Sequence, residues 1–251
     1  RWERDGNDIV VRPSAEGAVP VRLQVVSANI VRVTADPAGA FQRSPSLMRV
    51  ERSGSPPRAE VSEADGRLRV RAPGVSAQVA LDSGQVAFFD AAGRPLLSEA
   101  AGGRSFQATE FDGRPYYSVR QRFEGNADEG LYGTGLHQQG WMNLKGRDVE
   151  LLQHNIDNAI PYLTSSRGYG ILWDNNSITR YGDPRGLRQI GEVVTLYDRD
   201  GVEGALTATY SIDGDVKLSR REGKIDYQFI SGLEAFPDEG KNLAPGGRSD
   251  V

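Results

Sequence analysis

The stretch that decides the fold class is ADGRLRVRAPGVSAQVALDSG, residues 64–84. In its first half Leu68 and Val70 alternate with three arginines. In its second half apolar residues at every other position, Val75, Ala77, Val79 and Leu81, alternate with smaller or polar neighbours. A period of two residues places apolar side chains on one face of an extended chain. The stretch therefore predicts two successive half-buried β-strands.

The same signals continue on both sides of this stretch. Alternating apolar positions recur over 21–25 and 117–123, and the run Ile171-Leu-Trp173 is typical of a strand buried on both faces. Turn sequences separate the strands: Asp65-Gly66, Asp82-Ser-Gly84, Ala92-Gly-Arg-Pro95 and Asp112-Gly-Arg-Pro115. No long helical stripe competes, so we predict one large antiparallel β-sandwich from residue 1 to about 185.

A second unit is predicted to follow near residue 190. After the break at 183–186, short strands are expected at 206–210, 216–218 and 225–230. The tail from 237 to 251 is polar and rich in glycine, proline and charge, so these strands are too few to close a sandwich. We therefore assign 1–190 to the first sandwich and 191–251 to the start of a second, incomplete β-sandwich module.

Composition excludes several classes of partner and site. A formal net charge of -4, without a lysine and arginine run, gives no surface for nucleic acid. No cysteine is present, and no apolar segment approaches the roughly 20 residues that a membrane-spanning helix needs. The first residue is Arg1 and not methionine, which removal of a secretory leader, trimming of the sequence or proteolysis would each explain. We expect a periplasmic or secreted protein, with a cytoplasmic location also compatible.

Few residues could carry catalysis in this chain. The two histidines, His137 and His154, are too few for a histidine-rich metal cluster, so no metal and no cofactor are predicted. A Ser-His-Asp triad lacks the G-x-S-x-G turn, and the glycines of 130–140 open no helix that could bind phosphate. Asp148 and Glu150 share a face if they lie on a strand. They are either a retaining glycosidase pair, about 5–5.5 Å apart, or a solvated strand face, and we favour the solvated face.

Two polar and aromatic segments suggest contact with carbohydrate. The stretch 131–146, LYGTGLHQQGWMNLKG, has a single charge and several large side chains, which predicts packed, irregular backbone and not a flexible linker. The segment 153–158, QHNIDN, is polar and lies between two apolar strand candidates, so it is either a ligand-facing loop or a solvated loop. Aromatic faces and amide groups could bind sugar rings and hydroxyls, although we expect Trp173 to be a core residue.

Ordered sequence blocks resemble the amino-terminal domain of glycoside hydrolase family 31, and within it the bacterial α-xylosidases that act on xyloglucan. The blocks are Gly130-Leu-Tyr-Gly-Thr-Gly135, Asn143-Leu-Lys-Gly146, Leu152-Gln-His-Asn155, Pro161 and Ser165-Ser-Arg-Gly-Tyr-Gly-Ile-Leu-Trp-Asp-Asn175. The resemblance is specific over residues 130–183, and the sequence of residues 1–129 is compatible with it. Beyond it, 197–201 and 204–210 resemble the opening of a protective-antigen-like carbohydrate-binding module.

This resemblance implies a galactose-mutarotase-like β-supersandwich and a role beside a catalytic (β/α)₈ barrel. It implies retaining hydrolysis of α-glycosides by two aspartates on that barrel, so no catalytic residue is assigned to this chain. The expected substrate is a xyloglucan-type oligosaccharide. A loop of the amino-terminal domain shapes the substrate subsites in this family, which makes Gln153, His154 and Asn155 the predicted substrate-proximal residues.

Two alternative functions remain open on the sequence alone. The first is a stand-alone carbohydrate-binding protein. The second is an aldose mutarotase, which needs a general acid and a general base at the sugar ring. Mutarotases carry an Asn-His pair, whereas here His137 follows Leu136 and His154 follows Gln153.

Overall fold

The described chain is built from β-strands alone. The computed structural model describes residues 1–41, 46–48, 56–111, 114–153, 157–175, 177, 179–182 and 225–231. Every regular element in these ranges is a strand, and every strand pairing is antiparallel. Within the same ranges no helix is long and apolar enough to cross a membrane. The predicted all-β, antiparallel fold class is confirmed.

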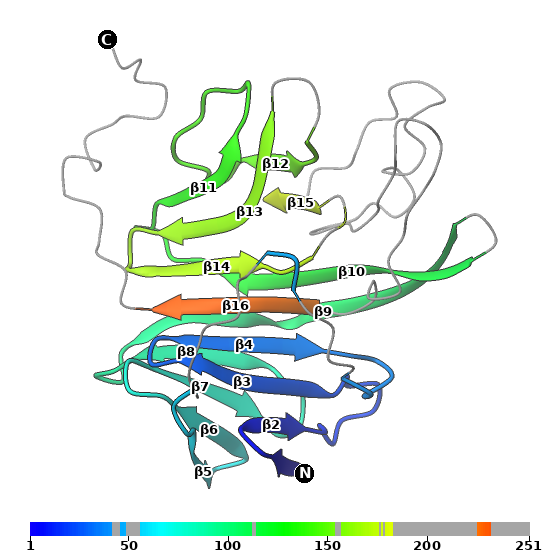
Figure 1. Cartoon of the computed structure of the whole chain (residues 1–251), viewed down its shortest axis with the longest axis vertical. Helices are drawn as coiled ribbons and strands as arrows, with labels where there is room; N and C mark the ends of the chain where they lie inside the picture. The colour runs from blue at the N-terminus through cyan, green and yellow to red at the C-terminus, as the bar shows by residue number, and fades with distance from the viewer. Residues whose placement is uncertain are drawn as a thin grey trace.

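The larger sheet contains eight of the described strands, in the order β1-β2-β3-β4-β16-β14-β13-β11. Their bounds are β1 Trp2–Asp5, β2 Asp8–Val11, β3 Val21–Ser27, β4 Ile30–Ala35, β11 Leu131–Leu136, β13 Asn158–Ser165, β14 Tyr169–Trp173 and β16 Ile225–Ser231. Figure 1 shows β16 lying between β4 and β14, so strands from both ends of the described chain meet in the middle of this sheet.

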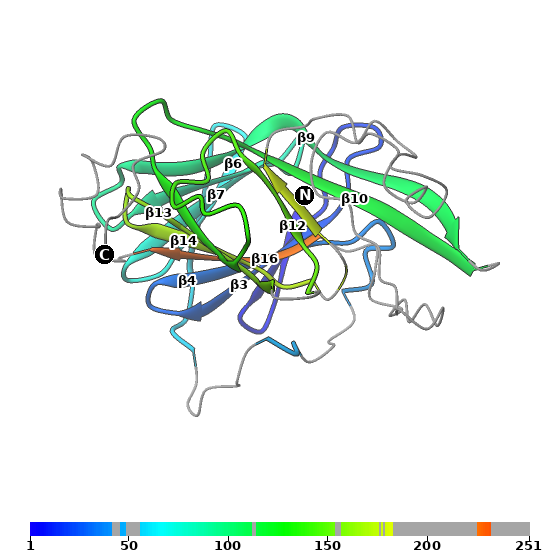
Figure 2. The same cartoon turned by 90° about the horizontal axis from the view of Figure 1, so that it is seen from above.

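The smaller sheet contains six described strands in the order β10-β9-β8-β7-β6-β5, and a separate pair consists of β12 and β15. Their bounds are β5 Glu60–Ala64, β6 Arg67–Arg71, β7 Val75–Ala80, β8 Val86–Asp90, β9 Pro95–Phe111, β10 Arg114–Glu124, β12 Asp148–Leu151 and β15 Thr179–Gly182. Figure 2 shows β6, β7, β9 and β10 along one side of the molecule, with β3, β4, β16 and β14 along the other.

The two sheets enclose one apolar core. Their facing side chains include several with no exposed surface: Ile9, Val21, Leu23 and Val33 from the larger sheet, and Leu68, Val79, Val86 and Phe88 from the smaller one. Burying each of these side chains contributes roughly 1.5–3 kcal/mol before the entropy of ordering the chain is subtracted. The alternation that predicted strands over 67–71 and 75–81 therefore marks the residues that hold the sandwich together.

The first predicted turn has the geometry that its sequence requires. Asp65 and Gly66 have φ values of 50° and 69°, and the strands on either side pair from Ala64 to Arg67. Positive φ at both central residues defines the two-residue hairpin turn whose twist matches that of paired strands. Glycine tolerates this conformation and aspartate is among the residues that adopt it most readily, so the local sequence fixes the register of β5 and β6.

The alternation predicts that the polar positions of a strand face water, but on β3 and β4 the structure buries such positions. Arg22 and Arg32, on polar positions of these strands, are buried. Arg22 donates to the carbonyl of Phe41 at 3.0 Å, and its guanidinium lies 5.4 Å from the centre of the Phe41 ring. Arg32 forms an ion pair with Asp174 at 3.2 Å. Segments distant in sequence therefore cover this face, which strand periodicity alone does not reveal.

Strand β16 connects the two units that the sequence predicts. Residues 225–231, assigned to the second unit, form a strand as expected, and this strand pairs with β4 and β14 of the first unit's larger sheet. The predicted strands at 206–210 and 216–218 lie outside the described residues. The division of the chain near residue 190, with a second module over 191–251, therefore stays a prediction.

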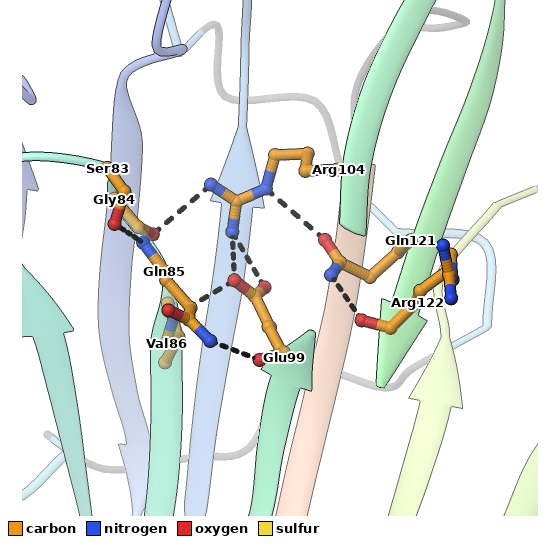
Figure 3. A network of polar contacts seen from close by, with 8 residues as sticks. All are labelled: Ser83, Gly84, Gln85, Val86, Glu99, Arg104, Gln121 and Arg122. Atoms are coloured by element: carbon orange, nitrogen blue, oxygen red, sulfur yellow. Dashed lines mark hydrogen bonds and ion pairs between the residues drawn. The ribbon is translucent and has the colours of Figure 1, made fainter. Parts of the chain in front are cut away.

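A buried ion pair connects β8, β9 and β10 (Figure 3). The Arg104 guanidinium donates to both carboxylate oxygens of Glu99, at 2.6 and 2.7 Å, and Glu99 is 2% exposed. Arg104 also donates to the Gln121 side chain at 3.2 Å and to the Gly84 carbonyl at 3.2 Å. The backbone N–H of Val86 donates to Glu99 at 2.9 Å. Such a pair is stable in a low-dielectric interior because its remaining polar groups are also satisfied.

We expect Arg104→Ala to destabilise the protein by about 3–5 kcal/mol, because it leaves the Glu99 carboxylate buried without its counter-ion. Urea denaturation followed by circular dichroism measures the change. The matched control is Arg94→Ala, since Arg94 forms an ion pair of the same 2.6 Å length with Asp90 but is exposed to solvent. The control should unfold close to the wild-type midpoint. Equal losses of unfolding free energy in the two variants would show that burial does not increase the contribution of the Glu99–Arg104 pair to stability.

Candidate functional site

The stretch 131–146 begins as a strand, which corrects the prediction that all of it is irregular. Residues 131–136 form β11 and pair with β13, with a bulge between Gly133 and Gly135. Gly135 has a φ of 103°, and a Cβ added there would lie 1.8 Å from the carbonyl oxygen of Asn158. The glycines therefore let two backbones approach more closely than any side chain would allow.

The rest of this stretch is held to its neighbours by hydrogen bonds. The side-chain oxygen of Asn143 accepts from the backbone N–H of Leu131 at 3.1 Å and of Lys145 at 3.0 Å. The Leu144 N–H donates to the Leu131 carbonyl at 2.7 Å. The Lys145 ammonium donates to the carbonyls of Asn126 and Ala127. These bonds agree with the prediction that the segment is packed and does not act as a flexible linker.

A buried carboxylate, Glu129, joins β11 to β13 and β14. Glu129 is 3% exposed and accepts hydrogen bonds from the Ser165 hydroxyl and the Tyr169 phenol. Its second oxygen accepts from the backbone N–H of Asn126 at 3.3 Å. Beside it, Gly130 and Ser166 exchange two hydrogen bonds of 2.9 Å. Glu129 therefore fixes the turn before β11 against the hairpin of β13 and β14.

Burial and the same carboxylate together lower the acidity of Tyr169. Burial, followed by the hydrogen bond to Glu129 and its negative charge, raises the pKa of Tyr169 well above 10.0, its ordinary value. Removing the proton would place a second negative charge beside Glu129 in a region shielded from water. Tyr169 therefore acts as a neutral hydrogen-bond donor in the folded protein.

A cavity of about 600 Å³ opens next to Glu129. Its walls are mainly apolar and come from the end of β10, from β11, β13 and β14, and from the β12 and β15 pair. The residues that matter most to its chemistry are Glu129, Thr134, Tyr162, Trp173, Arg180 and Tyr181. Trp173, which we expected in the core, is partly buried, packs against the core and also lines this cavity.

Of the three predicted substrate-proximal residues, the structure describes Gln153, and its side chain is exposed. His154 and Asn155 lie outside the described residues. The loop that contains them is anchored at both ends, since β12 ends at Leu151 and β13 begins at Asn158. Within the loop, one carboxylate oxygen of Asp157 is buried without a hydrogen-bond donor from the described residues.

The acidic residues of β12 are explained by strand structure. Asp148 and Glu150 lie on β12, which pairs with β15, and Asp148 forms an ion pair of 3.9 Å with Arg180. This arrangement favours the strand-face interpretation over a catalytic pair, because the Asp148 charge is matched by a cation on the neighbouring strand. In the described part of the chain, no three His, Asp or Glu side chains gather where they could hold a metal ion.

Glu129 and the cavity were not identified from the sequence. Glu129 follows Asp128 in a segment rich in small and charged residues, which resembles a solvated turn. The available signal was its position directly before the block Gly130–Gly135. Its two hydroxyl partners, Ser165 and Tyr169, lie 36 and 40 residues away within another of those blocks.

We expect the stability of the protein to fall as the pH rises above about 10, partly because of Tyr169. The pKa of Tyr169 in the folded protein lies above the unfolded value of 10.0. As the pH rises, the unfolded chain therefore loses the Tyr169 proton first, and this stabilises the unfolded state relative to the folded state. Tyr169→Phe should be less stable than wild type by about 1–3 kcal/mol at pH 8, and the difference should narrow between pH 9 and 11. Thermal unfolding at each pH measures this.

The control for this prediction is Tyr117→Phe, because Tyr117 is 37% exposed and does not contact Glu129 in the described structure. Its difference from wild type should not change between pH 9 and 11. If the difference in stability between wild type and Tyr169→Phe stays constant from pH 9 to 11, the proposed link between Tyr169 and Glu129 is contradicted.

Known structures and sequences share this architecture. The chain resembles the crystal structure of the GH31 α-xylosidase from Xanthomonas citri, with a TM-score of 0.71 and 56% sequence identity over 87% of this chain and 24% of that enzyme. It also resembles a GH31 α-xylosidase from a soil metagenome, with a TM-score of 0.65 at 23% identity over 92% of this chain and 32% of that chain, which supports the fold alone.

Curated relatives give the same picture. An uncharacterized family 31 glucosidase from Pseudescherichia vulneris is 33% identical over 63% of this chain and 33% of its own length. An α-xylosidase from Saccharolobus solfataricus is 41% identical over 25% of this chain and 10% of its own length. The chain thus spans a third or less of the length of these relatives.

The family assignment follows from the extent of the match. Residues 20–181 match the sequence model of one protein family, the glycosyl hydrolase 31 N-terminal galactose mutarotase-like domain. These residues include most strands of both sheets and the Glu129 contacts. The blocks that suggested this family from sequence alone lie inside the match. The chain belongs to the family of glycosyl hydrolase 31 N-terminal galactose mutarotase-like domains.

Proposed function

We propose that this chain is the non-catalytic amino-terminal part of a retaining α-glycosidase, an α-xylosidase that releases xylose from xyloglucan oligosaccharides. The observation that carries the proposal is the 56% identity, over 87% of this chain, with the Xanthomonas citri α-xylosidase. The catalytic (β/α)₈ barrel that the family resemblance implies would be supplied by the rest of the enzyme. The domain would support that barrel and contribute the 153–158 loop to the substrate site.

Two acidic groups in this region, Glu129 and Asp148, are engaged in the fold. Retaining hydrolysis needs two carboxyl groups about 5–5.5 Å apart, one as nucleophile and one as acid and base. Glu129 is occupied by the Ser165 and Tyr169 hydroxyls, and Asp148 is paired with Arg180. Neither group is free to attack an anomeric carbon or to donate a proton to a leaving oxygen.

An exposed apolar surface supports a partner on the side of β11 and β13. Leu136 is 68% exposed, Met142 63% and Ile160 48%. Leu136 pairs with Asn158, and Ile160 lies two residues further along the same strand, so Leu136 and Ile160 share one face of the sheet. Large neighbouring apolar side chains in water mark a contact surface. We assign this surface to the barrel of the same enzyme.

The loop has a physical role in this proposal. Its ends are fixed by two strands that pair with separate neighbours, β12 with β15 and β13 with β11 and β14. A polar segment held at both ends loses little conformational freedom when it contacts a sugar. Amide and imidazole groups at Gln153, His154 and Asn155 would then donate to and accept from sugar hydroxyls.

The proposal is tested by comparing the 251-residue chain with the full-length protein from the same gene. We expect the full-length protein to release xylose from a xyloglucan heptasaccharide, and the chain alone to release none, because the acid and base carboxyls are on the barrel. Chromatography of the released sugars measures this. Glucose release from maltose without xylose release would identify an α-glucosidase, and xylose release by the chain alone would show that it is catalytic.

The loop assignment gives a separate expectation in the full-length enzyme. His154→Ala and Asn155→Ala should each lower kcat/KM by about 3- to 10-fold, mainly through KM, because each removes one or two hydrogen bonds to bound substrate. The melting temperature should stay unchanged. Asn29→Ala is the control, since Asn29 is an exposed residue between β3 and β4. Wild-type kinetics in both loop variants would remove these residues from the substrate site.

A further inference from the structure

A tryptophan lies at the surface in the segment that follows β11. Trp141 is 38% exposed, and its sequence neighbours Gln138, Gln139 and Met142 are exposed as well. We call residues 137–146 the Trp141 segment. Tryptophan combines a large flat apolar surface with an N–H donor, and such side chains are enriched where one molecule contacts another. The exposed ring of Trp141 is therefore a candidate contact surface.

The Trp141 ring is held from one side by a cation. The guanidinium of Arg147 lies 5.0 Å from the centre of the ring, which is the geometry of a cation–π contact. Because the guanidinium occupies one face of the ring, a ligand would stack on the opposite face. A ring that is already fixed loses less conformational freedom when a ligand contacts it.

The backbone on both sides of Trp141 is anchored as well. On one side, Nε2 of His137 lies 2.8 Å from the carbonyl oxygen of Thr134, a β-branched residue held at the strained φ of 65°. On the other side, the Leu144 N–H donates to the Leu131 carbonyl at 2.7 Å. Precise binding sites need support of this kind, because a loosely held ring contributes little to affinity.

The groups next to Trp141 in the sequence are neutral. Residues 138–144 contain no charged side chain. Lys145 donates to two backbone carbonyls, and Arg147 is stacked on the ring. The exposed amides of Gln138 and Gln139 each offer hydrogen-bond donors and an acceptor. A flat apolar ring with neutral polar neighbours fits a sugar, which has C–H groups on its faces and hydroxyls at its edge, better than it fits a charged ligand.

The Trp141 segment leaves the sheet beside the loop that we assign to the substrate. Leu136, the last residue of β11, pairs with Asn158, the first residue of β13. The Trp141 segment therefore begins where the 153–158 loop joins the sheet (Figure 1). An oligosaccharide that contacts this loop would extend over the same end of the sheet.

We propose that Trp141 stacks against an outer ring of the oligosaccharide substrate, beyond the two rings that the cleaved bond joins. This inference rests on the proposed function and adds a specificity-determining residue to it. The rings at the cleaved bond need a site that excludes water, because charge stabilisation in the transition state is strong only there. Trp141 is open to solvent, so its ring suits a sugar outside that enclosed site.

The test compares two substrates of the full-length enzyme. One is a xyloglucan heptasaccharide, and the other is the disaccharide α-D-xylosyl-(1→6)-D-glucose, which has no outer ring. We expect Trp141→Ala to lower kcat/KM for the heptasaccharide about tenfold more than for the disaccharide, mainly through KM, because only the longer substrate loses a stacking contact. Initial rates of xylose release measure both values.

Further variants separate stacking from a contact between domains. Trp141→Tyr keeps a flat ring and should retain most of the preference for the heptasaccharide, whereas Trp141→Leu keeps only apolar volume and should behave like Trp141→Ala. Trp2→Ala is the matched control, since Trp2 is 36% exposed on β1, at the opposite edge of the larger sheet, and its kinetics should equal those of wild type.

Two outcomes would overturn the inference alone. They are equal losses on both substrates in Trp141→Ala, and wild-type preference for the heptasaccharide in Trp141→Leu. Either result would assign Trp141 to the contact with the barrel. If wild-type enzyme releases xylose from neither substrate, the proposed function itself fails, and this inference fails with it.

Discussion

The half of the domain that contains the cavity depends on the buried Glu129 carboxylate. A charge taken out of water must keep its hydrogen-bond donors, or the fold loses several kcal/mol. Here the donors are Ser165 and Tyr169, which lie on β13 and at the start of β14. The turn before β11 is therefore held against a hairpin that is distant in sequence, and the cavity wall takes its shape from this constraint.

The other half of the domain relies on apolar burial between two sheets. A prominent polar group in its interior is the Glu99–Arg104 network of the smaller sheet, which joins β8, β9 and β10 (Figure 3). This division places a well-packed core beside a region with glycine bulges, strained backbone and orphaned polar groups. Such features cost stability, and a well-packed neighbouring core offsets the cost. The arrangement suits a domain that supports a site at one edge.

The two proposed roles use different surfaces of this region. In the proposal, exposed apolar side chains on β11 and β13 would contact another domain, and the loop after β12 would contact a substrate. The cavity has mainly apolar walls that include the aromatic residues Tyr162, Trp173 and Tyr181. Each role depends on the β11 to β14 region being held in register, which is the effect of the Glu129 contacts and of the close backbone approach at Gly135.

The sequence by itself determined the fold class, because strand alternation and turn residues are local signals. Leu68 and Val70 showed the buried face of β6, and Asp65-Gly66 fixed its hairpin. The ordered blocks over 130–175 indicated the family. Tertiary structure decided the burial of Arg22 and the formation of β11 within a stretch that we predicted to be irregular. It also decided the role of Glu129 and the existence of the cavity. These features arise from contacts between residues far apart in the chain, and neither periodicity nor spacing encodes such contacts.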